Sequence, residues 1–283
     1  MKNPHALLID LLQKEMELRN YSPRSIQTYC SLMSRVAERL GISLDAISTE
    51  TFKTYLHQLI TCEGLSVSTI NQSISAFKIL QEDVLKRKWE DFKIKRPRKT
   101  QKLPVILSLE EVERLISVTS NIKHRVILML TYSAGLRKME VLQLKPSAID
   151  SKRMQVHVVQ GKGKKDRYTI LSPKVLEMLR LYYKTHRPAT FLFEPQGRKG
   201  KPLSEGTLNN IVKKNAQRAG IKKPISFHTL RHCFATHLLE KGVNLRWIQQ
   251  FMGHNSLKTT SGYLHLINTD LTCVVSPLDG MNI

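Results

Sequence analysis

The stretch 226–263 carries the residue types that phosphoryl transfer needs. It holds His228 and Arg231 three residues apart, a Gly-His pair that ends at His254, and Tyr263 nine residues after that histidine. Three residues subtend about 300° on a helix, so His228 and Arg231 can share one face. A guanidinium can fork onto the non-bridging oxygens of a phosphate, and a tyrosine hydroxyl can attack phosphorus. The stretch therefore predicts a site that holds a phosphate beside a nucleophilic tyrosine.

A second arginine, Arg137, stands in the run AGLRKMEVLQL, between a glycine and an amphipathic segment. Two guanidinium groups on one phosphate would offset the charge that builds in the transition state, as phosphoryl transfer without a metal ion requires. Glu140 follows Arg137 by three residues; it either orients that arginine or forms an ordinary surface pair. We therefore predict that Arg137 joins Arg231 at one site, with no cofactor.

A β-hairpin with a basic tip is predicted between these two regions. The strand-like runs 154–160 and 167–171 flank the glycine- and lysine-rich segment 161–166. The pattern G-x-x-x-x-G-K-S/T is absent and no helix follows directly, so an ATP site is not indicated. The basic residues of this hairpin expected to contact the phosphates of a partner are Lys164, Lys165 and Arg167.

Five segments, in this order and with these gaps, resemble the tyrosine recombinase (phage integrase) family, most of all its short Xer-like members. They are GLRKME, GKGKKDR, HTLRHCFATHLL, the pair Gly253-His254, and Tyr263. The resemblance covers nearly the whole chain and implies cutting and rejoining of DNA through a covalent 3′-phosphotyrosine. The family's usual Tyr-Thr-His is Tyr263-Leu264-His265 here, which leaves the nucleophile itself unchanged.

The resemblance also implies a set of catalytic residues. They are Arg137, Lys162, His228, Arg231, His254 and Tyr263. The two arginines would bind the scissile phosphate, and the tyrosine would attack it. Lys162 would protonate the leaving 5′ oxygen, although spacing alone leaves open a swap of roles with Lys164. The two histidines fill the positions where the family keeps His or Lys, and His or Trp.

The charge of the chain points to a polyanionic partner. The formal net charge is +22, from 45 Lys and Arg against 23 Asp and Glu. Residues 1–100 hold 16 and 11 of these, a balance of +5, which leaves 29 and 12, or +17, for residues 101–283. A basic protein that performs no chemistry on DNA would also fit this excess. We expect the stronger phosphate contacts in the second half.

The predicted fold is mainly α-helical with a small β-sheet or hairpin. Residues 1–88 show four amphipathic helices, and the resemblance implies a SAM-like core-binding domain that lies on DNA. A basic linker is expected at 89–103, where the alternative is an ordinary solvated loop, and a catalytic domain at 104–270. The helical residues expected to contact DNA, each of which could equally be a solvated surface residue, are Arg24, Gln27, Thr28, Asn71 and Gln72.

The last residues, 271–283, are predicted to form a tail. Apolar residues after Tyr263 need a groove, and the resemblance implies one on a neighbouring protomer. The implied assembly is a homo-tetramer on two DNA duplexes, each with paired inverted half-sites. The alternative is a tail that folds back on its own domain.

Other readings of the chain explain fewer residues. A metal hydrolase is disfavoured because no carboxylate accompanies the histidines, and His232 and His237 lie five residues apart, off one helical face. A helix-turn-helix regulator, or an inactive relative, would not account for every catalytic position being occupied. A type IB topoisomerase shares the chemistry, but the separate helical domain and the short tail favour a recombinase.

Cellular location follows from the termini and the cysteines. The first residues form neither a secretory signal nor a membrane span, and the four cysteines lie far apart with no C-x-x-C pair. We therefore expect a cytoplasmic, nucleoid-associated protein without a membrane partner. The sequence does not identify the target DNA site or the biological task, which could be integration, transposition, inversion or dimer resolution. It also does not show whether accessory proteins or a second recombinase are needed.

Overall fold

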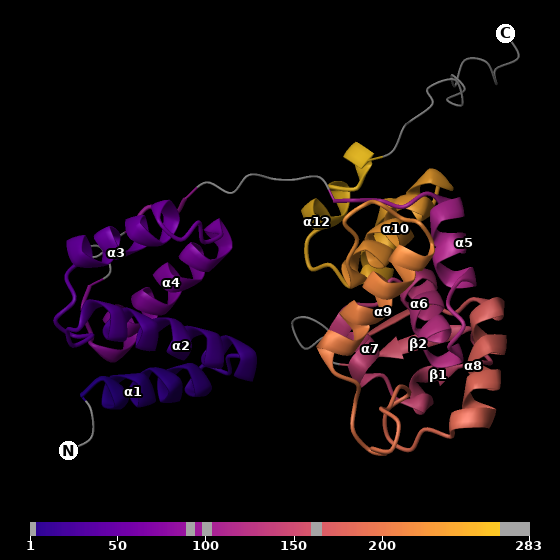
Figure 1. Cartoon of the computed structure of the whole chain (residues 1–283), viewed down its shortest axis with the longest axis horizontal. Coiled ribbons are helices and arrows are strands. Elements are labelled where there is room, and N and C mark those ends of the chain that lie inside the picture. Colours follow the sequence, from indigo (N-terminus) through magenta and orange to yellow (C-terminus); the bar gives the residue numbers. More distant parts are fainter. Residues whose placement is uncertain (1–3, 89–93, 98–103, 160–165, 267–283) are drawn as a thin grey trace, which may run out of the picture. The chain divides into compact units, whose positions relative to one another are not determined.

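The computed structural model describes residues 4–88, 94–97, 104–159 and 166–266. The chain divides into two compact units, Met1–Lys102 and Leu103–Ile283, coloured indigo to magenta and magenta to yellow in Figure 1. Each unit has an apolar core of its own. The predicted fold class, mainly helical with a small antiparallel sheet, is confirmed.

All regular elements in the described part of the N-terminal unit are helices. Its elements are α1 (Pro4–Leu18), α2 (Pro23–Leu40), α3 (Thr49–Thr61), α4 (Val67–Ile79) and a π-helical turn, η1 (Leu80–Val84). Serine residues cap three of these helices: Ser22, Ser48 and Ser66 each accept a hydrogen bond from the backbone N–H three residues ahead. Inside, the rings of Phe52 and Phe77 stack with centroids 4.0 Å apart. The fourth predicted helix is thus present as α4, but the chain continues into the wider π-helical turn η1 at its C-terminal end.

The C-terminal unit begins with helices that lead to the first predicted arginine. They are α5 (Leu109–Ser117), α6 (Ile122–Ala134) and α7 (Lys138–Gln143), followed by a 3₁₀ turn, η3 (Pro146–Ala148). A capping box of Ser108 and Glu111 opens α5. Helix α6 is largely buried and packs against α8 (Pro173–His186) and α10 (Phe227–Glu240). Because α6 packs against both α8 and α10, the turn that follows its C-terminus has a fixed position.

A three-stranded antiparallel sheet lies within the described part of this unit. Its strands run in the order β1 (Ile149–Asp150), β2 (Gln155–Val158) and β3 (Arg167–Ile170), with Val156 opposite Thr169. The predicted hairpin is confirmed as β2 and β3. Strand β1 was not predicted, since two residues are too few to show an alternating pattern. The hairpin tip, with Lys162, Lys164 and Lys165, lies outside the described residues.

The remaining helices follow the sheet. They are α8, α9 (Glu205–Arg218), α10, α11 (Leu245–Met252), α12 (Leu257–Ser261) and a 3₁₀ turn, η4 (Leu264–Leu266). Gly253 ends α11 in the left-handed conformation, as the sequence predicted. No helix in the described ranges is long and apolar enough to cross a bilayer. Most of the predicted linker, 89–103, and all of the predicted tail, 271–283, lie outside the description.

Candidate active site

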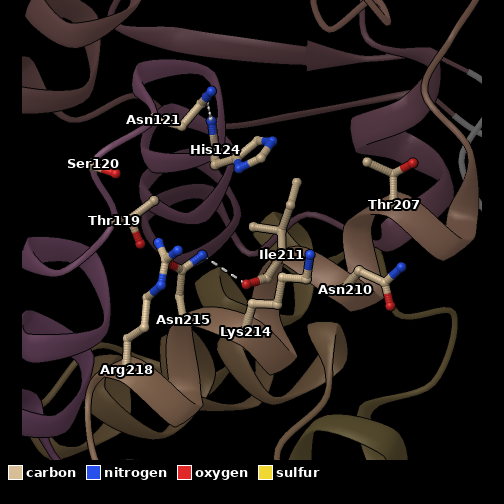
Figure 2. A pocket seen from close by; sticks show the side chains of 10 residues that line it. All are labelled: Thr119, Ser120, Asn121, His124, Thr207, Asn210, Ile211, Lys214, Asn215 and Arg218. Atoms are coloured by element: carbon tan, nitrogen blue, oxygen red, sulfur yellow. Dashed lines mark hydrogen bonds between the residues drawn. The ribbon is translucent and has the colours of Figure 1, made fainter.

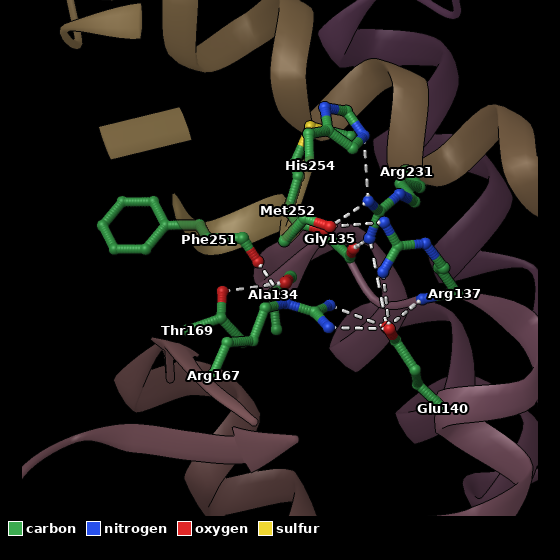
Figure 3. Close-up of polar contacts among 11 residues, drawn as sticks. Ala134, Gly135, Arg137, Glu140, Arg167, Thr169, Arg231, Phe251, Met252 and His254 are labelled. Atoms are coloured by element: carbon green, nitrogen blue, oxygen red, sulfur yellow. Dashed lines mark hydrogen bonds and ion pairs between the residues drawn. The ribbon is translucent and has the colours of Figure 1, made fainter. Parts of the chain in front are cut away.

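Arg137 is delivered by the turn that ends α6. Gly135 takes a φ of +61°, and a Cβ at this position would overlap the ring of Phe234, so the turn requires glycine. Arg137 then caps α7, and its guanidinium donates to the carbonyl of Gly253 at 2.9 Å and to Glu140 at 2.9 Å (Figure 3). Two segments more than a hundred residues apart in sequence are thereby joined at this arginine.

Glu140 is the acidic centre of the site. Its side chain is 6% exposed and accepts a further hydrogen bond from the backbone N–H of Arg137 at 2.7 Å. Burial alone would raise the pKa of Glu140, but hydrogen bonds and charge from Arg167 and Arg137 outweigh burial and bring the pKa down to about 2. Of the two roles left open by the sequence, the orienting role therefore fits this geometry, and a surface pair does not.

Arg167 is buried, which is at odds with the DNA contact predicted for it. Its guanidinium donates to both oxygens of Glu140, at 2.6 and 2.7 Å, and its Nε donates to the carbonyl of Phe251 at 2.8 Å. A Cβ on Gly253 would lie 2.7 Å from the Arg167 Cδ, so the chain here leaves room for that arginine. With its donors occupied and its side chain 7% exposed, Arg167 positions Glu140 instead of reaching a DNA phosphate.

Arg231 enters the same cluster from α10. Its guanidinium is 4% exposed, donates to the carbonyls of Gly135 and Met252, and lies 4.0 Å from Glu140 (Figure 3). Burial first, and then the charges of Arg137 and Arg167, lower the pKa of Arg231 to about 9, with Glu140 acting in the opposite direction. Arg231 stays cationic at neutral pH. The structure thus brings Arg137 and Arg231 to one place, as the sequence predicted.

His254 connects the arginines to the tyrosine segment. Its Nε2 lies 3.2 Å from an Arg231 guanidinium nitrogen, and its Nδ1 lies 2.9 Å from the Thr260 hydroxyl. Because arginine only donates, Nε2 accepts, and Nδ1 carries the proton. Burial, followed by the charges of Arg231 and Arg137, lowers the pKa of His254 to about 4. The ring is therefore neutral at pH 7, which matches this tautomer.

Tyr263 lies against two histidines. Its ring is parallel to that of His254 within 7°, at 6.4 Å between centroids, and its hydroxyl is 2.9 Å from Nδ1 of His232. Tyr263 is 6% exposed; burial raises its pKa, and the charges of Arg231 and Arg137 act against that rise. His232 was considered in the sequence only as a buried or surface histidine, and its contact with Tyr263 is a finding of the structure.

His228 is an exposed residue in the first turn of α10, near the arginine cluster. Partial burial of its ring, followed by the charges of Arg231, Lys138 and Arg137, lowers the pKa of His228. Lys162 lies outside the described residues. In the N-terminal unit, the side chains of Arg24, Gln27 and Gln72 are exposed.

Two of the predicted DNA contacts, Thr28 and Asn71, are only partly exposed. The hydroxyl of Thr28 donates to the carbonyl of Arg24 at 2.8 Å, and Oδ1 of Asn71 is buried. The geometry favours the exposed residues over these two as DNA contacts.

A second, basic pocket lies between the start of α6 and the outer face of α9 (Figure 2). It has a volume of about 450 Å³ and is lined by polar side chains that include His124, Asn210, Lys214 and Arg218. None of the predicted catalytic residues lines it. Within the described ranges, no three His, Cys, Asp or Glu side chains come together in a group that could hold a metal ion.

The site and the fold together define a phosphoryl-transfer enzyme with a separate helical domain. Residues 106–269 match the phage integrase family, and residues 8–91 match the N-terminal SAM-like domain of phage integrases. The protein y4qK of Sinorhizobium fredii is 39% identical over 95% of this chain and 87% of its own length. Tyrosine recombinase XerA of Pyrococcus horikoshii is 34% identical, over 88% of this chain and 85% of that protein.

Solved structures show the same fold. A crystal structure of a XerA recombinase aligns with a TM-score of 0.56 and 26% identity, over 95% of this chain and 96% of that one. A XerH recombinase bound to a palindromic difH substrate aligns with a TM-score of 0.70 and 24% identity, over 91% and 80%. The chain belongs to the phage integrase family. It is a tyrosine-type site-specific recombinase.

Proposed function

We propose that this recombinase holds a DNA phosphate between Arg137 and Arg231 and attacks it with Tyr263. The observation that carries the proposal is the cluster around Glu140, which holds both guanidinium groups in place before any substrate arrives. Preorganised donors of this kind stabilise the charge that develops in a transition state. The attack would leave a 3′-phosphotyrosine and a free 5′-hydroxyl, and the reverse attack by another strand's 5′-hydroxyl would rejoin the DNA.

The proposed leaving-group acid is Lys162, which lies in the sequence between strands β2 and β3. The reason for this choice is the match of GKGKKDR to the family, so Lys164 stands as the alternative. Lys162→Ala should be rescued by a DNA in which the leaving 5′ oxygen is replaced by a better leaving group, because no proton is then needed. If Lys164→Ala is rescued instead, the acid is Lys164.

The proposed DNA partner is a duplex with paired inverted half-sites, bound by a homo-tetramer across two duplexes. A XerH recombinase of this fold is bound to a palindromic substrate, and a lambda integrase tetramer is bound to a Holliday junction. The N-terminal unit would contribute contacts through Arg24, Gln27 and Gln72. Contacts of these side chains with phosphates and bases would fix the position of the duplex on the N-terminal unit. The proposed location of the enzyme is the nucleoid.

The predicted tail exchange belongs to the same proposal. Deleting residues 270–283 should leave binding to a single site almost unchanged but abolish cooperative binding and the pairing of two sites. Gel mobility of one-site and two-site DNA reports both. A truncated protein that pairs sites as well as the full chain would mean that the tail does not act between protomers.

Covalent capture tests the central step. A DNA site would first be selected from a random duplex pool by the Tyr263→Phe variant. A copy nicked near the scissile phosphate would then be incubated with the unaltered protein and resolved under denaturing conditions. We expect a protein–DNA adduct that persists in excess chelator. Relaxation of supercoils at random sequences, with no preference for the selected site, would instead favour the topoisomerase alternative.

A further inference from the structure

His232 is the one neighbour of the Tyr263 hydroxyl, among the contacts of the described residues, that can take its proton. The imidazole Nδ1 lies 2.9 Å from the phenolic oxygen, within hydrogen-bond reach. Both groups are largely removed from water, with Tyr263 only 6% exposed. The contact joins α10 to the segment that follows α12, so it forms only when the tyrosine segment is seated.

The other groups around the hydroxyl are unable to accept. Arg231 has only donors. His254 uses Nε2 to accept from Arg231 and Nδ1 to donate to Thr260, so both of its ring nitrogens are engaged. His228 lies on the same helix, but within the described residues the hydrogen-bond partner of the Tyr263 hydroxyl is His232, not His228. By elimination, the lone pair available to the Tyr263 proton is on His232 Nδ1.

The protonation states agree with this direction. Burial, and after it the charges of His228 and Arg231, lower the pKa of His232 to about 4, so the ring is neutral at pH 7 and has a lone pair to offer. Burial raises the pKa of Tyr263, so the phenol keeps its proton until attack. A bound phosphate would offset the positive charges of Arg231 and Arg137. Burial and the charge of His228 would still hold the pKa of His232 down, but the share of the lowering caused by Arg231 would shrink, making the ring a stronger base when substrate is present.

We propose that His232 is the general base that accepts the proton of Tyr263 as the phenolic oxygen attacks phosphorus. The bond from the Tyr263 oxygen to phosphorus forms, and the bond from phosphorus to the 5′ oxygen breaks. The phenolic proton moves to His232 Nδ1, giving an imidazolium, while the leaving 5′ oxygen takes a proton from the general acid. In the rejoining direction the imidazolium returns its proton to the phenol. This inference rests on the proposed role of Tyr263 as the nucleophile.

The decisive variant is His232→Asn. The Asn side-chain oxygen can occupy the place of Nδ1 and accept the same hydrogen bond, but an amide cannot take the proton. General-base catalysis contributes about 10²–10⁴-fold, so we expect His232→Asn to lower the rate of covalent adduct formation by about that factor on the nicked site. We also expect the residual rate to rise with pH, because hydroxide then replaces the lost base. Imidazole in the buffer should partly restore His232→Ala.

His237→Asn is the matched control. It removes a histidine from the same helix whose Nδ1 faces the hydroxyl of Tyr132 at 2.8 Å, away from the arginine cluster. It should lower the melting temperature without imidazole rescue and without changing the pH dependence of cleavage. DNA affinity and melting temperature of each variant separate a folding defect from a chemical one.

The possible results divide clearly. If His232→Asn forms adduct as fast as the unaltered protein, a hydrogen bond suffices and the general base is elsewhere. If His232→Ala forms adduct faster, His232 restrains the tyrosine instead of activating it, which also overturns the inference. If the unaltered protein forms no adduct, or Tyr263→Phe forms one, the proposed function itself fails, and that outcome is distinguishable from both.

Discussion

Helix α10 carries two histidine–tyrosine pairs whose local chemistry is nearly the same. His237 Nδ1 lies 2.8 Å from the Tyr132 hydroxyl, and His232 Nδ1 lies 2.9 Å from the Tyr263 hydroxyl. The second nitrogen of His237 lies 3.0 Å from the carbonyl of Leu107, so this histidine has a partner on each side and ties α6 and the start of the catalytic unit to α10.

The surroundings make the pairs different. Burial raises the pKa of Tyr132 to about 12, with Cys233 and Glu240 adding to the rise. Burial also raises the pKa of Tyr263, but Arg231 and Arg137 oppose it. A neighbouring cation favours the phenolate, and a neighbouring anion disfavours it. The two pairs therefore share a hydrogen bond and differ in the charges around the phenol: guanidinium groups oppose the rise in pKa at Tyr263, while Cys233 and Glu240 add to it at Tyr132.

The largest expected effect comes from Tyr263→Phe, which removes the reactive hydroxyl. We expect no detectable covalent adduct, since no other group would replace the nucleophile. Denaturing gel analysis of the nicked site measures the adduct, and binding to the intact site should stay near the unaltered level. A denaturant-resistant complex with this variant would show that the nucleophile is another residue.

Arg231→Ala removes the charge that distinguishes the two pairs. Loss of one donor to a developing oxyanion costs about 10²–10³-fold in rate, and we expect a fall of at least that size in the single-turnover cleavage rate. Arg125→Ala serves as the control, because Arg125 donates to the backbone carbonyl of Thr119 away from the cluster. If both variants lost the same cleavage rate per folded molecule, Arg231 would not stabilise the transition state more than an arginine outside the cluster does.

A smaller effect is expected on the pH dependence of the free energy of unfolding, through the two histidines next to Tyr263. His232 and His254 have a pKa of about 4 in the folded protein, against an ordinary value of 6.5. Between these values the unfolded chain binds more protons than the folded one, so the free energy of unfolding falls as the pH is lowered from about 6.5 toward about 4. Urea unfolding at several pH values should show this slope, and His232→Asn should reduce it. An unchanged slope in the variant would mean that His232 titrates normally in the fold.

Tyr132→Phe is expected to have the smallest effect. It deletes one hydrogen bond to His237 and leaves a buried acceptor unpaired, which costs about 1–3 kcal/mol of unfolding free energy. Cleavage by the folded enzyme should be unchanged, since this pair is outside the arginine cluster. Urea unfolding and adduct formation measured on the same sample give both quantities. If cleavage fell by more than the loss of folded protein explains, Tyr132 would also contribute to the reaction, and the contrast between the two pairs would be wrong.

The local signals of the sequence predicted much of the fold. The four N-terminal helices and the hairpin strands depend on patterns of residues close in the chain, so they are visible without coordinates. The grouping of Arg137 with Arg231 was predicted from chemistry, because both suit one phosphate.

The contacts made by Arg167 and His232 could not be predicted in this way. On β3, Arg167 and Thr169 face inward, while Tyr168 and Ile170 are 47% and 36% exposed. An alternating pattern read from residue type would place the apolar pair inside. The buried carboxylate of Glu140 reverses that preference, and it comes from another element. The position of His232 next to Arg231 likewise gives no distance to a tyrosine 31 residues further on.

Glu140 also sets the electrical balance of the site. Three guanidinium groups, from Arg137, Arg167 and Arg231, surround one carboxylate, so the formal charge of the group is 3 − 1 = +2. A phosphodiester at rest carries one negative charge, but a phosphorus attacked by a phenolate carries two. In the proposed reaction, the charge of +2 on the cluster therefore exceeds the single negative charge of the bound phosphodiester and balances the two negative charges of the five-coordinate state. Without Glu140, a charge of +3 would hold intact DNA more tightly and discriminate less between the resting and the reacting phosphate.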